Sequence, residues 1–81
     1  MRLLLLAFAS AADALGAGET TVDVPDGLDV AGLRAELARR YPVLQPLWPR
    51  LAIGVDGVIA DAATPLREGA EVALLPPVSG G

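Results

Sequence analysis

Residues 1–9 read MRLLLLAFA, and the structure assigned to this apolar run determines how the rest of the chain can be arranged. Such a run is typical either of a secretory signal peptide or of a strand buried on both faces of a sheet. It carries a single arginine, lies at the lower length limit of a signal peptide, and is much shorter than the about 20 residues of a membrane span. We therefore predict a central strand buried on both faces, in a chain that is neither exported nor bound to a membrane.

The segments that follow predict a second strand and one helix. Residues 11–18 are mostly small and are expected to form a simple connection. Glu19–Val24 alternates polar and apolar side chains, as a strand with one solvated face does. Between residues 30 and 41 the apolar side chains recur at the three- and four-residue spacing of one helical face. Asp29 is placed to cap this helix at its N-terminus, and Pro42 ends it.

The second half of the chain resumes strand character after an interruption. Residues 42–50 are rich in proline and are expected to be irregular, with Trp48 folded back onto the core. Leu51–Val55 has the composition of a strand. Asp56-Gly57 is the residue pair of a tight hairpin turn, because both positions favour a positive φ. Val58–Ala60 is therefore predicted to be a short return strand.

The last strand completes the predicted fold. Glu71–Leu75 is apolar enough to pair in the sheet, and Pro76-Pro77 ends the pairing because proline has no N–H to donate. The order strand, strand, helix, strand, strand, strand predicts an α+β fold with a mixed sheet packed on one main helix. We expect residues 1–75 to form one domain, since 81 residues leave no room for a second core, and residues 76–81 to form a flexible tail.

The composition excludes many kinds of chemistry. The sequence contains no histidine, cysteine or lysine, which removes thiol nucleophiles, histidine acid–base catalysis, thiolate metal sites and lysine Schiff bases. Ten acidic residues against six arginines give a net charge of −4, which repels nucleic-acid phosphates. We therefore expect no nucleic-acid partner, no bound cofactor and no enzymatic activity of the chain by itself.

One acidic group could suggest a cation site. Asp23, Asp26 and Asp29 surround a turn, but their spacing lacks the glycine and the terminal glutamate of a calcium-binding loop. A turn followed by a helix cap explains all three residues. We predict no metal site.

The C-terminal residues 76–81, PPVSGG, are the most distinctive part of the sequence. The prolines stiffen the exit from the sheet, and the two glycines have no Cβ, so the backbone can enter a channel too narrow for side chains. The carboxylate of Gly81 is the one group here that can be chemically activated, and we predict that it carries the function. The residues expected to bind a partner are Leu75, Pro76, Pro77, Val78, Ser79 and Gly80.

Positions spread over essentially the whole chain match one known family. They are Phe8-Ala9, Leu15-Gly16, Asp29-Val30, Leu33, Leu37, Val55-Asp56-Gly57, Pro65-Leu66, Glu68-Gly69, Glu71-Val72-Ala73 and residues 76–81. The chain resembles the ubiquitin-like β-grasp sulfur carriers, and within them the MoaD family, the small subunit of molybdopterin synthase. The terminal PPVSGG is the most specific of these matches.

The resemblance implies a reaction cycle in the cytoplasm. An ATP-dependent adenylyltransferase, MoeB-like, would convert the Gly81 carboxylate to an acyl-adenylate, and a sulfur donor would displace AMP to leave a thiocarboxylate. The tail would then enter the MoaE-like large subunit and give its sulfur to precursor Z during molybdenum cofactor biosynthesis. The chain would be the non-catalytic subunit of this sulfurtransferase.

Departures from the family pattern leave other pathways open. Ala12-Asp13 stands where the family often has an Arg-Glu pair, Asp56 where it often has Asn, and Ala70 where it often has Asp. One alternative is a ubiquitin-like carrier for thiamine, tungsten cofactor, cysteine or tRNA thiolation, or a protein modifier. The other is a β-grasp interaction module whose tail is never modified.

Overall fold

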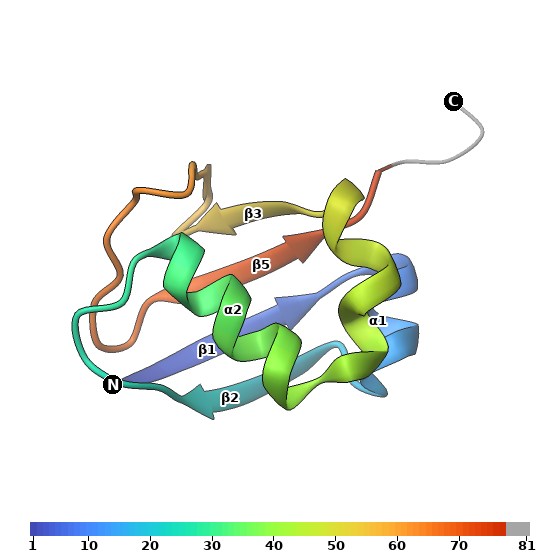
Figure 1. Ribbon diagram of the computed structural model, residues 1–81, viewed down its shortest axis with the longest axis horizontal. Helices are drawn as coiled ribbons and strands as arrows, with labels where there is room; N and C mark the ends of the chain where they lie inside the picture. The colour runs from blue at the N-terminus through green and yellow to red at the C-terminus, as the bar shows by residue number, and fades with distance from the viewer. Residues whose placement is uncertain (78–81) are drawn as a thin grey trace.

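A computed structural model shows a mixed five-stranded sheet with helices packed against it, and it describes residues 1–77 (Figure 1). The elements in chain order are β1 (Arg2–Ala7), α1 (Ala9–Leu15), β2 (Glu19–Asp23), α2 (Val30–Arg40), η1 (Pro42–Arg50), β3 (Ala52–Val55), β4 (Val58–Ile59) and β5 (Glu71–Leu75). The fold is the predicted α+β arrangement. In the part of the chain that the structure describes, none of the helices has the length and apolar character needed to cross a membrane.

The strand order in the sheet is β2-β1-β5-β3-β4, with β1 and β5 parallel and every other pair antiparallel. The run at residues 1–9 therefore does form an interior strand, flanked by β2 and β5. The last strand in the sequence, β5, lies in the middle of the sheet. This topology brings Met1 and the end of β5 to opposite ends of the sheet, as Figure 1 shows.

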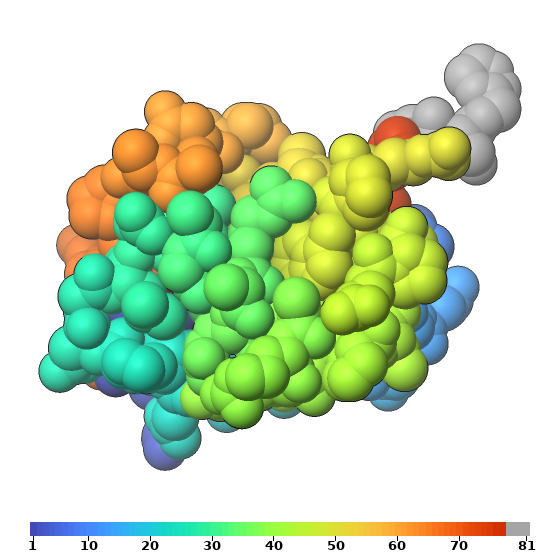
Figure 2. Space-filling model, viewed as in Figure 1, coloured from blue at the N-terminus to red at the C-terminus, as the bar shows by residue number. Residues whose placement is uncertain are grey.

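The helices cover only one face of the sheet. In the space-filling view of Figure 2, α2 and η1 (green to yellow) hide the strands behind them. On this face Leu3, Leu5 and Ala7 of β1 are buried, whereas Leu4 and Leu6 on the other face are only half-buried. The prediction that this strand is buried on both faces is therefore wrong, because no helix within residues 1–77 packs on the second face. We call this second face the open face.

The connection between the first two strands is a helix, not the irregular segment predicted for residues 11–18. Helix α1 begins at Ala9 and ends at Leu15, and its C-cap Gly16 closes the last turn with a φ of 79° and an N–H bond to the Ala12 carbonyl (2.9 Å). Alanine has the best helix propensity, and glycine at such an end is a common stop signal. The fold thus has more than one helix on its covered face.

Residues 42–50 also differ from the prediction. They form η1, a 3-10 helix with Pro42 in its first turn, where a missing N–H breaks no intrahelical bond, and with Pro46 and Pro49 inside it. Trp48 is buried, as predicted, and Leu44 is fully buried beside it. Helix α2 begins as predicted, since the Asp29 carboxylate accepts a hydrogen bond from the Gly32 N–H at 2.8 Å.

The core lies between the covered face of the sheet and the helices. Its largest fully buried side chains are Leu3, Leu5, Leu33, Leu37, Leu44, Val72 and Leu74. Both the first strand of the chain, β1, and the last, β5, supply residues to it. The same apolar core therefore holds both strands in place.

Candidate functional site

Strand β5 fixes the position at which the C-terminal residues leave the sheet. It pairs with β1 on one side, where Ala7 faces Leu74, and with β3 on the other, where Ala52 faces Leu75. Leu74 has no exposed surface and anchors the strand in the core. The strand ends at Leu75, before Pro76, as the prolines predict. We call Leu75–Pro77 the tail root.

One side of the tail root borders a pocket on the open face. This sheet-face pocket has a volume of about 230 Å³ and is lined chiefly by Leu6, Phe8, Gly54, Ile59, Ala73 and Leu75. Gly54 and Ala73 face each other across β3 and β5, and their lack of bulk makes the floor of the pocket. Phe8 is 48% exposed and Ile59 is 67% exposed, although both are large apolar side chains. An exposed apolar patch of this kind is typical of a surface that binds a protein, a membrane or a ligand.

The β3–β4 hairpin that bears this pocket is held by Asp56. Asp56 and Gly57 have φ values of 50° and 86°, which confirms the predicted tight turn. The Glu71 N–H donates to the Asp56 carboxylate at 2.9 Å, and the Arg67 guanidinium lies 3.3 Å from it. The Glu71 bond first, and the Arg67 bond with it, lower the pKa of Asp56. The hairpin is thus tied to β5 through a carboxylate that stays charged.

The other side of the tail root borders a second pocket, next to the helices. This helix-side pocket has a volume of about 310 Å³ and is lined by Ala9, Ser10, Leu47, Arg50, Pro76 and Pro77. The start of α1 and the end of η1 form its walls, and the two prolines of the tail root form the rest. The tail root therefore emerges between two pockets, one on each side of the sheet.

The structure describes only some of the predicted site residues. The structure brings Leu75 to the sheet-face pocket and Pro76 and Pro77 to the helix-side pocket. Val78, Ser79, Gly80 and Gly81 lie outside the described residues. Their predicted roles, including that of Gly81, therefore stay predictions.

Sequence reasoning missed Phe8, Ile59 and Arg50 as parts of this region. A signal for Ile59 was present, because it lies in a two-residue strand at the edge of the sheet, where little can cover an apolar side chain. Phe8 and Arg50 gave no such signal, since their positions depend on the two helices that were not predicted.

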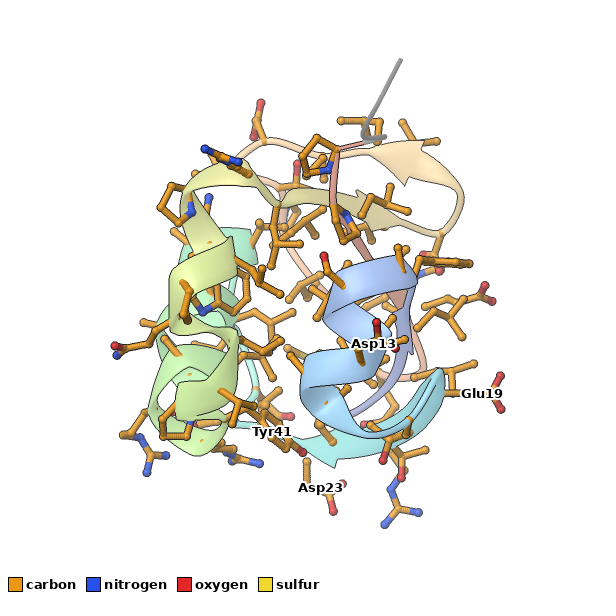
Figure 3. The ribbon with its side chains drawn as sticks, turned by 90° about the vertical axis from the view of Figure 1, so that its right-hand side faces the viewer. Asp13, Glu19, Asp23 and Tyr41 are labelled. Atoms are coloured by element: carbon orange, nitrogen blue, oxygen red, sulfur yellow. The ribbon has the colours of Figure 1, made fainter. Side chains whose placement is uncertain are left out.

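The acidic residues near the other end of the sheet have separate structural roles. Asp23 accepts a hydrogen bond from Arg2 at 3.1 Å, and Asp26 lies 2.7 Å from the Met1 ammonium group. These bonds are the main reason that the pKa values of both carboxyls are lowered. In Figure 3, Asp13, Glu19 and Asp23 lie well apart from one another on the surface. Within residues 1–77, no group of three or more potential ligands is arranged to hold a metal ion.

Comparison with known proteins gives consistent similarities. The model of the ThiS family matches residues 5–81. The molybdopterin synthase sulfur carrier subunit of Mycobacterium tuberculosis is 40% identical over 60 residues, which are 74% of this chain and 72% of that protein. The shared stretch therefore covers most of both proteins.

Solved structures extend the similarity over the whole chain. SAMP1 from Haloferax volcanii superposes with a TM-score of 0.87 at 26% identity, covering 100% of both chains. A chain in the complex of subunits 1 and 2 of molybdopterin-converting factor from Helicobacter pylori superposes with a TM-score of 0.73 at 27% identity, again covering 100% of both chains. The latter protein has been seen bound to a second subunit.

Proposed function

Because the chain belongs to the ThiS family, we propose that it is the sulfur carrier subunit of a molybdopterin synthase, with the C-terminal carboxylate of Gly81 as its reactive group. One observation carries this proposal: the central strand β5 ends in a tail root set between two pockets, and the sequence continues from it to Gly80-Gly81. The name of the Mycobacterium tuberculosis relative supports the same function.

The chemistry needs an activated carboxylate. In the proposed cycle the Gly81 carboxylate attacks the α-phosphate of ATP on a MoeB-like adenylyltransferase, and pyrophosphate leaves. Sulfide released by a sulfur donor then attacks the acyl carbon and AMP leaves with the C–O bond electrons, which produces the thiocarboxylate. The thiocarboxylate sulfur is transferred to precursor Z in the large subunit, and the carboxylate is regenerated by water. A carboxylate needs such activation because it is a poor electrophile until one oxygen becomes part of a leaving group.

In this proposal the chain needs no catalytic side chain of its own. Its part is to present the tail and to bind the protein that performs each step, so the chain is the non-catalytic subunit of the enzyme. No cofactor binds to it, and ATP is used by the activating partner. We place the cycle in the cytoplasm, where ATP is available.

The large subunit is proposed to dock on the sheet-face pocket. The pocket adjoins the tail root at Leu75, so one protein can cover the apolar patch and take up the tail at the same time. Exposed apolar side chains such as Phe8 and Ile59 gain most when a partner removes them from water. The two-subunit complex of the Helicobacter pylori relative supports a partner of this kind.

Reconstitution tests the proposal. The full chain is mixed with ATP, the adenylyltransferase, a sulfur donor, the large subunit and precursor Z, and molybdopterin formation is measured. The wild-type chain should support formation, whereas a chain lacking Gly81 should not. A chain with one alanine added after Gly81 keeps every residue but moves the carboxylate, and it should also be inactive.

The outcomes separate the alternatives. A wild-type chain that is loaded with sulfur but supports no molybdopterin formation would be a carrier for another pathway. Equal results for the wild-type chain and the Gly81 deletion would contradict any role of the C-terminus and leave an interaction module with an unmodified tail.

A further inference from the structure

The arginines of the chain differ in whether they have a partner. Within residues 1–77, five of the six are engaged: Arg2 with Asp23 at 3.1 Å, Arg39 and Arg40 with Glu36 at 2.7 and 2.8 Å, Arg67 with Asp56 at 3.3 Å, and Arg34 with the Trp48 carbonyl at 3.0 Å. Arg34 also lies 5.3 Å above the Trp48 ring. Arg50 is the exception, since no carboxylate of residues 1–77 pairs with it.

Arg50 is also the arginine that lines a pocket beside the tail root. It is the last residue of η1 and lines the helix-side pocket together with Pro76 and Pro77. Among the described residues that line this pocket, Arg50 is the charged one, and Ser10 supplies the other polar side chain. A positive charge that pairs with no carboxylate of residues 1–77 therefore adjoins the tail root of a protein whose net charge is −4.

Any protein that takes up the tail from its root must approach this pocket, because both prolines of the root form part of its wall. A guanidinium that loses water without gaining an anion is costly, whereas one that gains a carboxylate in a fixed geometry orients the complex. Arginine suits this role because its planar group binds both oxygens of a carboxylate.

We propose that the helix-side pocket is an anion-binding subsite that accepts an Asp or Glu side chain of the large subunit, with Arg50 as its ion-pair partner. Ser10 supplies a second donor through its hydroxyl group. This inference rests on the proposed function, because it takes the large subunit as the occupant. The sheet-face pocket then supplies apolar contact on one side of the tail root, and Arg50 sets the orientation on the other.

The test is the affinity of the full-length chain for its large subunit, measured by titration calorimetry at low and high salt. Arg50→Gln should weaken binding about 3- to 10-fold and Arg50→Glu more strongly, with the difference from wild type decreasing at high salt. Arg39→Gln and Arg39→Glu are matched controls, because they change the net charge equally on an exposed arginine of α2. The controls should stay within about 2-fold of wild type. Arg50 variants that bind as the Arg39 variants do would overturn the proposal.

A second measurement tests whether an acidic group of the chain itself occupies the helix-side pocket. If an acid of the chain itself, such as the terminal carboxylate, filled the pocket, Arg50→Gln would destabilise the free chain. We expect its melting temperature to stay within about 3 °C of wild type, as for an unpaired surface residue. A larger loss would overturn the assignment of the pocket to the partner.

Failure of this inference and failure of the proposed function give different results. A wild-type chain that does not bind the large subunit contradicts the proposed function. A wild-type chain that binds it, with no difference for Arg50→Gln, contradicts only the anion subsite.

Discussion

The two ends of the open face are built from the same strands but differ in chemistry. At the end where β1 begins, polar side chains face each other, and Arg2 pairs with Asp23 across β1 and β2. At the end where β5 finishes, Leu6 faces Ala73, which in turn faces Gly54 of β3. The polar end satisfies its charges within the chain. The apolar end exposes Phe8 and Ile59 beside the tail root, so we expect a partner to cover this end.

The largest expected effect comes from the core beneath the two ends. Leu74 lies under the apolar end and Leu3 under the polar end, and both side chains are fully buried. Changing either to alanine should lower the free energy of unfolding by about 2–5 kcal/mol, because each change leaves a cavity. Chemical denaturation measures this loss. A far smaller loss for Leu74→Ala than for Leu3→Ala would contradict the anchoring of the tail root by β5.

The next effect should separate the two ends by binding. Ile59→Asp places a charge in the sheet-face pocket and should weaken binding of the large subunit about 10- to 100-fold. Thr21→Asp adds the same charge to an exposed position of β2 at the polar end and serves as the matched control. Calorimetry should find the control close to wild type. Equal losses for both variants would mean that net charge, and not the pocket, governs docking.

The carboxyl groups at the polar end should make the stability of the fold depend on acid. The pKa values of Asp23 and Asp26 at the polar end are lowered in the folded protein, mainly by hydrogen bonds to Arg2 and to the Met1 ammonium group. A lowered pKa stabilises the fold above the unfolded value of about 4, and this contribution is lost as the pH falls through the folded value. Stability should therefore decrease below about pH 4, and urea unfolding at several pH values measures this. A fold that gains stability from pH 5 to pH 3 would contradict these pairs.

The smallest effect is expected from the ion pair itself. Arg2→Ala removes the exposed pair with Asp23, which is screened by water and contributes little. Stability should fall only slightly, its acid dependence should become shallower, and affinity for the large subunit should not change. Thermal unfolding and calorimetry on the same sample test all three points. A clear loss of affinity would place the polar end inside the interface.

Sequence reasoning predicted the parts of the fold that depend on local signals. The Asp29 cap and the Asp56-Gly57 turn were identified because each needs particular side chains at particular positions. Helix α1 was missed because it is only seven residues long and follows Phe8, an N-cap residue that offers no side-chain hydrogen bond. The 3-10 helix η1 was missed because a segment rich in proline is normally predicted to be non-helical.

The candidate site could be predicted only along one segment. Leu75, Pro76 and Pro77 were identified because they adjoin one another in the sequence. The two pockets are formed by residues that lie far apart in the sequence, such as Ala9 with Arg50 and Leu6 with Ile59. These contacts depend on the strand order and on the helices α1 and η1, which no local sequence signal predicted.

The most direct test is the mass of the intact chain after incubation with ATP, the adenylyltransferase and a sulfur donor. We expect the wild-type chain to gain the mass difference between sulfur and oxygen, located at Gly81 by fragmentation. The variant lacking Gly81 should keep its original mass. A wild-type chain that gains no sulfur with its own activating enzyme would contradict the assignment of the function to its C-terminal carboxylate.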